Sequence, residues 1–203
     1  MTRILITRHG QAEHNLNTAF FMGRSPAARL TEKGREQARR LGARLAAEGL
    51  RPRIVCSSLP RAVETAEIVA SALGVEAPVQ DEAFWELNKG DWEGKMPRDL
   101  PPEVKRLVDA DPFGFRYPGG ESYRAVLDRA APAFERWVER WPDATILFVL
   151  HGDVIRALLY HLIGFPSFRI GDWITDPCAL NEFQQEPGAR RWVVRVNDAS
   201  HLG

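Results

Sequence analysis

Short apolar runs rich in β-branched residues alternate along this chain with longer segments in which apolar residues recur every three or four positions. The short runs lie at residues 3–7, 53–57 and 145–150, and each has the length and composition of a strand. The run at 145–150 is apolar throughout, which is the pattern of a strand buried on both faces. Residues 178–184 and 191–197 predict a closing pair of strands, joined through Pro187-Gly188.

The segments of helical period predict four main helices, at residues 31–48, 61–73, 121–141 and 153–163. The first begins at Thr31, which suits an N-cap, and ends at Gly49, while the second ends at Gly74. Strands that alternate with helices predict a three-layer α/β fold, with a mostly parallel central sheet flanked by helices.

Residues 87–120 break this rhythm. They are rich in glycine and proline and contain one short helical segment around 102–110. The stretch is too short to bury a core of its own, so we interpret it as an excursion that covers the substrate on the active face. The sequence shows no linker or internal repeat, and we expect a single domain over residues 1–203.

Charge and cysteine content exclude several classes of function. The 27 basic and 27 acidic residues cancel, which argues against a nucleic-acid scaffold or a polybasic membrane binder. The two cysteines, Cys56 and Cys178, form no CxxC pair and predict neither a disulfide framework nor a thiolate zinc site. With no signal peptide and no apolar stretch long enough to cross a membrane, we expect a cytoplasmic protein.

Candidate chemistry gathers where the predicted strands end. Arg8-His9-Gly10 follows the first strand, Ser57 to Arg61 follows the second, and His151-Gly152 follows the strand at 145–150. Ligands of open α/β sheets bind beyond the carboxyl ends of the strands. Two imidazoles and two guanidiniums would converge there on one pocket. Such a pocket suits a phosphoryl group, because the guanidiniums are forked donors for its oxygens and an imidazole can attack phosphorus.

The motifs as a set resemble the histidine phosphatase superfamily, the phosphoglycerate mutase-like proteins. The resemblance begins with Arg8-His9-Gly10 followed by Asn15, and it continues through six further segments. In the family's order these are LTEKGREQA (30–38), SSLPRAVETA (57–66), ELNKGDWEG (86–94), PGGES (118–122), HGDVIRALL (151–159) and VNDASHL (196–202). The resemblance therefore covers the chain nearly from end to end.

The resemblance implies a role for each site residue. His9 would be the nucleophile that becomes phosphorylated, attacking as a neutral imidazole whose other nitrogen is hydrogen-bonded, we expect to a backbone carbonyl. Glu86 would donate and then accept the proton, although Glu82, Asp91 and Glu93 lie close enough in sequence to remain alternatives. His151 would be a phosphate ligand, held protonated by the dianion. The implied phosphate pocket comprises Arg8, Asn15, Gly23, Arg61, His151 and Gly152.

Two other histidines are interpreted more simply. His14 stands where the family often has an aromatic residue, and we expect it in the pocket wall. His161 belongs to a helix that is apolar nearly all round, so we expect a buried core histidine.

We therefore predict a metal-independent phosphomonoesterase, without a cofactor, that hydrolyses small phosphorylated metabolites through a phosphohistidine. The family's mutases carry a longer insertion before the PGGES-like segment, and residues 95–117 leave no room for it. This favours the phosphatase branch. Mutase-type phosphoryl transfer and a non-catalytic phospho-ligand binding protein remain alternatives, as does a metal-dependent hydrolase built on His9, His14 and His151.

The expected partner is a small phosphate monoester, with neither nucleic acid nor membrane. Specificity is expected to come from residues 20–29 (Phe20 to Arg29) and 95–117. The sequence does not name the physiological substrate, and it leaves the oligomeric state open, a homodimer included.

Overall fold

One six-stranded sheet organises the chain. The computed structural model describes residues 1–16, 21–25, 27–164, 167–186 and 191–203. In these residues the strand order is β3-β2-β4-β1-β5-β6. The first four strands in sequence are parallel, and β5 and β6 add an antiparallel pair at one edge. The strands are β1 (Thr2–Arg8), β2 (Arg53–Cys56), β3 (Val79–Gln80), β4 (Thr145–Leu150), β5 (Leu180–Gln185) and β6 (Arg191–Asp198).

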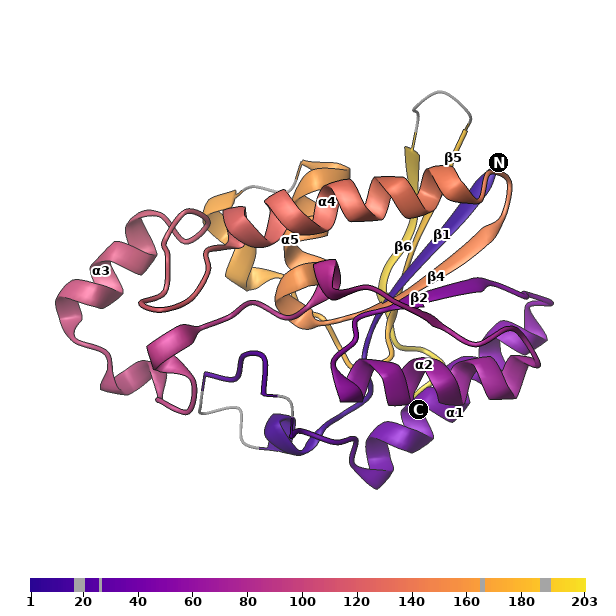
Figure 1. The fold of residues 1–203 in the computed structure, drawn as a ribbon, viewed down its shortest axis with the longest axis horizontal. Helices are drawn as coiled ribbons and strands as arrows, with labels where there is room; N and C mark the ends of the chain where they lie inside the picture. Colours follow the sequence, from indigo (N-terminus) through magenta and orange to yellow (C-terminus); the bar gives the residue numbers. More distant parts are fainter. Residues whose placement is uncertain (17–20, 26, 165–166, 187–190) are drawn as a thin grey trace.

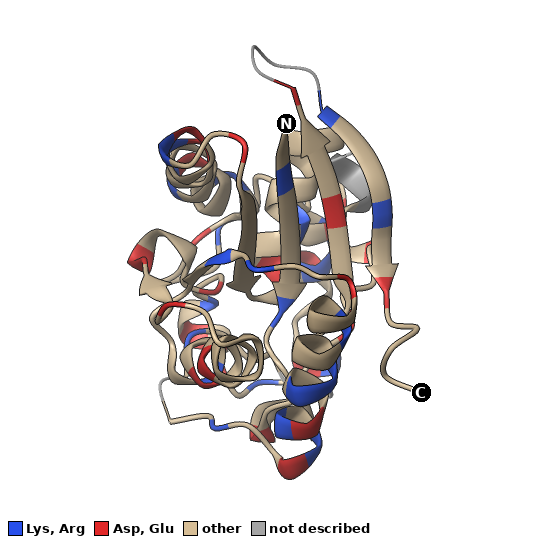
Figure 2. Cartoon of the chain, turned by 90° about the vertical axis from the view of Figure 1, so that its right-hand side faces the viewer, with Lys and Arg blue, Asp and Glu red and all other residues tan. Residues whose placement is uncertain are grey.

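Helices cover both faces of this sheet, which confirms the predicted three-layer α/β fold (Figure 1). On one face lie α1 (Glu32–Ala47) and α2 (Pro60–Leu73), and on the other α4 (Tyr123–Arg140) and α5 (Gly152–Ile163). Successive residues of β1 serve the two faces in turn, because side chains alternate along a strand. Leu5 packs with the cores of α1 and α2, whereas Ile4 and Ile6 belong to the core beneath α4 and α5. Charged residues gather mainly on the helices and loops (Figure 2).

The predicted ends of the first two helices agree with the structure. The Thr31 hydroxyl accepts a hydrogen bond from the Gly34 N–H at 3.0 Å, so Thr31 is the N-cap of α1. Gly74 closes α2 in the left-handed conformation, with φ at 61°. The predicted connection at Pro187-Gly188 lies outside the described residues. None of the described helices is long and apolar enough to span a membrane.

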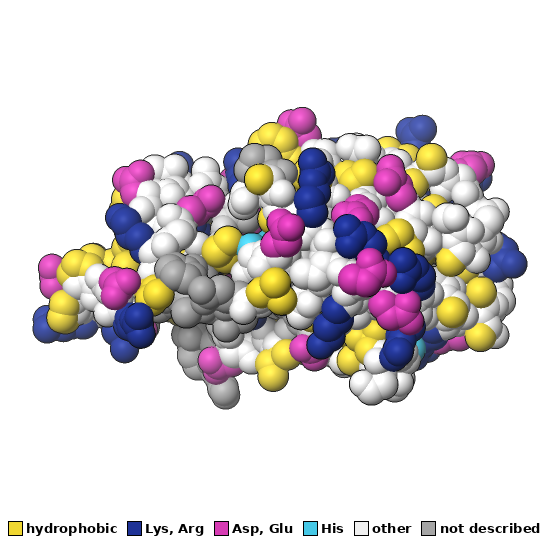
Figure 3. Space-filling view, turned by 90° about the horizontal axis from the view of Figure 1, so that it is seen from below, with side chains coloured by type: hydrophobic (Ala, Val, Ile, Leu, Met, Phe, Trp, Pro, Cys, Tyr) yellow, Lys and Arg dark blue, Asp and Glu magenta, His cyan; other side chains and the backbone are white. Residues whose placement is uncertain are grey.

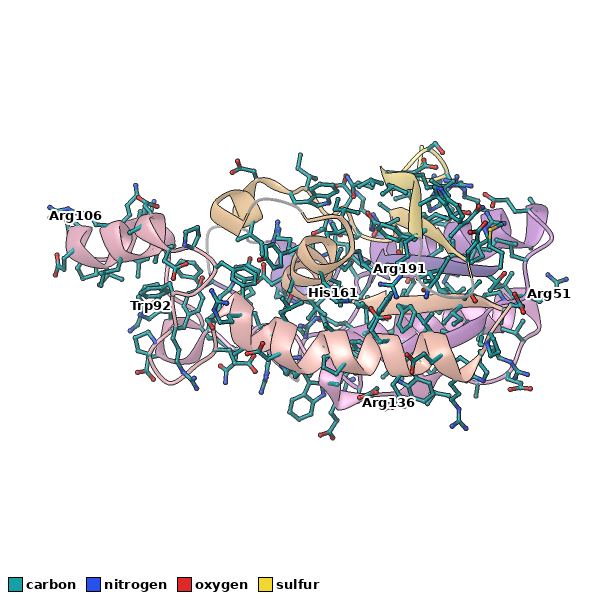
Figure 4. The ribbon with its side chains drawn as sticks, turned by 90° about the horizontal axis from the view of Figure 1, so that it is seen from above. Arg51, Trp92, Arg106, Arg136, His161 and Arg191 are labelled. Carbon is teal, nitrogen blue, oxygen red and sulfur yellow. The ribbon has the colours of Figure 1, made fainter. Side chains whose placement is uncertain are left out.

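The prediction for His161 was wrong. His161 is exposed on the last turn of α5, where its Nε2 is 2.7 Å from Glu135 Oε1 of α4. Arg191 of β6 donates to the same carboxylate, and Figure 4 shows His161 and Arg191 close to each other. The apolar pattern holds for the first two turns of α5, whereas its final turn is only partly buried. His161 therefore lies at the surface beside Glu135 and Arg191, and not in the core.

The excursion at residues 87–120 has two parts that differ in how far they are buried. Its first part carries the aromatic ring of Trp92, which packs against Phe21, Phe115 and Tyr117 at centroid distances of 5.7, 5.5 and 5.1 Å. The second part includes α3 (Pro102–Ala110), which has no buried residue and stands at one end of the molecule. Arg106 marks this end in Figure 4. The short 3₁₀ turns of the chain are η1 (Glu13–Leu16), η2 (Glu82–Phe84), η3 (Gly90–Trp92), η4 (Pro97–Asp99) and η5 (Ser167–Asp172).

The strand register brings the three candidate segments to one edge of the sheet. Arg8 at the end of β1 pairs with Leu150 at the end of β4, and Cys56 at the end of β2 pairs with Val149. Because these strands are parallel and adjacent, the residues that follow them meet in one place.

Candidate active site

Two histidines and one arginine form the buried floor of the site. The His9 N–H donates to the Leu150 carbonyl at 2.9 Å, which fixes His9 beside the end of β4. The rings of His9 and His151 lie 5.2 Å apart, and both residues are almost fully buried, at 1% and 0% exposure. Arg61, in the first turn of α2, is also buried and donates from Nε to His9 Nε2 at 3.2 Å.

These contacts define the tautomer of His9. Its Nδ1 lies 2.7 Å from the Gly10 carbonyl oxygen, which can only accept, so Nδ1 carries the proton. Nε2 then holds the lone pair, consistent with the donor that Arg61 directs at it. Burial, Arg61 and Arg8 hold the pKa of His9 well below its usual value. At neutral pH His9 is therefore an uncharged imidazole with its lone pair on Nε2, and the expectation of a carbonyl partner is confirmed.

Arg61 also contacts the loop that follows η1. Its Nη1 donates to the Ser25 carbonyl at 3.0 Å and its Nη2 to the Gly23 carbonyl at 3.1 Å. Burial lowers the pKa of Arg61 to about 10, which leaves it cationic at neutral pH. Three of the five N–H groups of a guanidinium are thus used by described residues, and two remain as donors.

Arg8 and His151 have buried polar atoms without partners. Arg8 Nη1 donates to the Thr175 carbonyl at 2.9 Å, but its Nε has no partner in the described part of the chain. Both ring nitrogens of His151 are equally unpartnered among those residues. Buried polar groups are normally hydrogen-bonded, so their grouping here indicates a place for an oxyanion.

The charge of His151 depends on such an anion. Burial, Arg61 and His9 hold its pKa well below the usual value for histidine. The dianion expected from the sequence is the group that would oppose these three effects and favour the imidazolium.

A cavity of about 310 Å³ adjoins this group, although His9, Arg61 and His151 are not themselves in its lining. Five predicted site residues line it directly: Arg8, Asn15, Gly23, Glu86 and Gly152. His14 lies in its wall, as expected, with its ring 5.7 Å from that of His9. Histidine side chains show only as small patches on the face seen in Figure 3, where basic and acidic side chains alternate over the right-hand half.

The remaining predicted phosphate ligands have distinct local reasons for their positions. Asn15 Oδ1 accepts the Ala12 N–H at 2.9 Å, which leaves the Asn15 amide nitrogen to donate. A Cβ at position 23 would lie 1.7 Å from Glu93 Oε1, so only glycine fits there without moving that carboxylate. Gly152 is the first residue of α5, and the partial positive charge of a helix N-terminus favours anions.

Glu86 is the predicted acid that reaches the cavity. Its side chain is buried, Oε1 accepts the Leu87 N–H at 2.9 Å, and burial together with the Asp153 carboxylate raises its pKa. Glu82, Asp91 and Glu93, the alternatives in sequence, are not in the lining of this cavity. The geometry therefore favours Glu86 as the proton-transfer residue.

The sequence did not single out three charged residues of the cavity wall, Lys89, Asp153 and Arg156. Lys89 Nζ donates to Asp153 Oδ2 at 2.8 Å, and Arg156 Nη1 donates to Oδ1 at 2.7 Å. The signal for Asp153 was its place two residues after His151, on the first turn of a helix that begins at the site. Lys89 follows Glu86 by three residues, but no pattern connects it with α5.

The segments expected to determine specificity contribute unequally. Phe21 and Met22 line the cavity, whereas Phe20 and Pro26 lie outside the described residues. No residue of 95–117 is in this lining. Instead, α3 borders a neighbouring cavity of about 390 Å³, which shares Phe21 with the first one. Among the described side chains, no group of three or more His, Cys, Asp or Glu is placed to hold a metal ion.

Comparison with known proteins relates this chain to one protein family. The sequence profile of the histidine phosphatase superfamily (branch 1) matches residues 4–199. A Cronobacter sakazakii protein named "Probable phosphoglycerate mutase GpmB" is 31% identical over 210 residues, covering 100% of this chain and 95% of the relative.

Two solved structures extend this relationship. YhfR of Bacillus stearothermophilus superposes with a TM-score of 0.87 at 32% identity, over 100% of both chains. The mycobacterial glucosyl-3-phosphoglycerate phosphatase Rv2419c gives a TM-score of 0.84 at 25% identity, over 97% of this chain and 99% of that one.

Proposed function

This chain belongs to the histidine phosphatase superfamily (branch 1), and from that premise we propose that it is a metal-independent phosphomonoesterase acting on small phosphorylated metabolites. The observation that carries the proposal is the state of His9. A neutral imidazole with its proton fixed on Nδ1 places its Nε2 lone pair next to the buried Arg61, and the adjoining cavity is lined by Arg8. This arrangement suits nucleophilic attack on a phosphate ester.

In the first step, His9 Nε2 would attack phosphorus as the bond from phosphorus to the ester oxygen breaks. Arg8, Arg61 and the Gly152 end of α5 would offset the charge on the phosphoryl oxygens. Glu86, whose pKa is raised by burial, would give its proton to the leaving alkoxide. The products of this step are the free alcohol and a phosphohistidine.

In the second step, ionised Glu86 would take a proton from a water molecule that attacks the phosphohistidine. The N–P bond breaks, inorganic phosphate leaves, and His9 returns to its neutral form with Glu86 protonated again. Positioned acid–base catalysis of this kind contributes about 10²–10⁴-fold to the rate.

Hydrolysis is favoured over transfer to a second substrate. This preference is supported by the cavity lining, which includes no residue of 95–117, and by the place of α3 at one end of the molecule. Phosphoglycerate mutase activity is the second candidate, favoured by the name of the GpmB relatives. Free phosphate released per phosphoester consumed separates the two. A ratio of one supports the phosphatase, and conversion of 3- to 2-phosphoglycerate without free phosphate would overturn it.

The nucleophile is tested with His9→Ala, assayed on an aryl phosphate in the presence of a chelator. The variant should lose essentially all turnover. His161→Ala is the matched control, because that histidine lies on the exposed last turn of α5 and should leave turnover unchanged. Equal rates for His9→Ala and the wild type would contradict the proposal. Activity that dies with chelator and returns with metal would instead support a metal-dependent hydrolase.

The acid is tested with Glu86→Gln. We expect alkyl phosphates to lose about 10²–10⁴-fold in kcat/KM. Aryl phosphates should lose far less, because their leaving group needs little protonation. Glu82→Gln, at a neighbouring exposed carboxylate, is the control. Equal losses on both substrate types would move the role to another acid.

A further inference from the structure

The buried ion pair between Lys89 and Asp153 has no part in the phosphatase steps above. Asp153 is 5% exposed, and its carboxylate also accepts the Tyr123 hydroxyl at 2.5 Å and the Arg156 guanidinium at 2.7 Å. The Lys89 ammonium lies 5.7 Å from the ring centroids of both Phe21 and Tyr117. Two opposite charges are thus fixed in the cavity wall by contacts from several elements.

This ion pair is adjacent to Glu86. The Asp153 N–H lies 3.5 Å from Glu86 Oε2, and Glu86, Lys89 and Asp153 line the same cavity. The carbonyl of Glu86 is held separately, by Arg24 at 3.1 Å and Arg129 at 3.3 Å.

Besides the ion pair, the charged groups that act on the Glu86 carboxyl are Arg8 of β1, Arg61 of α2 and Arg156 of α5. Among the described residues, Asp153 is therefore the anion that acts on this carboxyl, against several cations.

We propose that Asp153 is a positioning residue whose fixed negative charge keeps Glu86 protonated at neutral pH, with Lys89 as the opposing charge that limits the effect. The proposal rests on the proposed function, since it concerns the proton donor of that reaction. A like charge makes ionisation of a neighbouring carboxyl less favourable, and an opposite charge makes it more favourable. Without Asp153, the surrounding cations would leave Glu86 ionised, unable to donate a proton to an alkoxide.

Asp153 can fulfil this role only if it stays ionised itself. Burial alone would favour its neutral form, but Lys89 and Arg156 hold the pKa of Asp153 well below its usual range. The same two cations, with the Tyr123 hydroxyl, hold the carboxylate in one orientation. Lys89 also acts on Glu86 directly, and there it opposes Asp153.

The experiment is the pH dependence of kcat/KM for an alkyl phosphate, whose alkaline limb follows loss of the Glu86 proton. Asp153→Asn should move this limb to lower pH by about 1–3 units, the size of shift that a neighbouring charge causes. Lys89→Met should move it to higher pH. Shifts in opposite directions are the signature of an electrostatic role, because a general loss of structure lowers the rate without moving the limb.

Glu182→Gln is the control, because Glu182 is a buried carboxylate of β5, paired with Arg3 and Arg195 of the sheet and outside the cavity lining. The alkaline limb of the Glu182→Gln variant should not move. An unmoved limb in both Asp153→Asn and Lys89→Met, or movement of both in one direction, overturns the inference. If Asp153→Asn does not fold, as judged by thermal unfolding, the direction of the Lys89→Met shift decides alone. The proposed function is tested separately, because activity that survives in the His9→Ala variant would contradict it.

Discussion

The close approach of two backbones at Gly34 provides a test of how tightly the fold positions His9. Gly34 lies in the first turn of α1, and a Cβ at this position would lie 2.0 Å from the Gln11 carbonyl oxygen. That oxygen already accepts the Thr31 N–H at 2.9 Å and the Thr31 hydroxyl at 3.2 Å. Gly34→Ala therefore forces apart the start of α1 and the turn that carries His9.

The magnitude follows from these distances. Ordinary contact begins at 3.4 Å, so the Gln11 carbonyl must move from 2.0 Å by about 1.4 Å. Alanine in a helix normally stabilises by about 1 kcal/mol over glycine. Here the movement breaks the two bonds from Thr31, each contributing about 1 kcal/mol, and adds backbone strain. We expect a net loss of about 1–3 kcal/mol in the free energy of unfolding, and a loss in kcat/KM of about 10²-fold, the effect of a 1 Å misplacement.

The assay pairs urea denaturation with kcat/KM for an aryl phosphate. Gly171→Ala is the matched control, since a Cβ there meets nothing within 4 Å. It should change the free energy of unfolding by less than about 0.5 kcal/mol and leave the rate unchanged. Wild-type rate and equal or greater stability in Gly34→Ala would refute the idea that this contact holds His9 in place.

Three further predictions concern charge. Arg61→Lys keeps the cation but cannot reach the three acceptors of the guanidinium, so kcat/KM should fall about 10²–10³-fold at unchanged net charge. Vanadate should inhibit competitively, and His9→Ala should weaken that inhibition. Burial raises the pKa of Glu135, but hydrogen bonds from His161 and Arg191 lower it to about 2 from 4.5. The stability that Glu135→Gln removes, about 1 kcal/mol after allowance for solvent screening, should be present at pH ~5 and vanish as the pH falls from ~4.5 to ~2 in urea titrations.

Periodicity predicted the elements that have a strong pattern and missed one that has none. The apolar runs at 3–7 and 145–150 correspond to β1 and β4, and the capping residue Thr31 marks the start of α1. The strand β3 has only two residues, both exposed, so no alternation exists for a pattern to detect. The prediction for His161 was wrong for the opposite reason. Its apolar neighbours in sequence suggested burial, but the turn that carries it contacts solvent.

The candidate site likewise has contacts that the sequence could predict and contacts that it could not. Residues at strand ends could be grouped from sequence, because parallel neighbours in a sheet place their carboxyl ends together. The partners of Arg61 could not be predicted from sequence, since two of them are backbone carbonyls of a loop. The pairing of Lys89 with Asp153 could not be predicted either, because these residues are 64 positions apart and meet only where a loop packs on α5.

The most direct test of the account is to trap the phosphoenzyme. The protein is mixed with a ³²P-labelled phosphomonoester, quenched in alkali, where phosphohistidine survives, and digested for mass spectrometry. We predict a burst of label that approaches one phosphoryl group per chain, located on His9 and absent from His9→Ala. Label located on His151, or steady turnover with no trapped label on His9, would contradict the account.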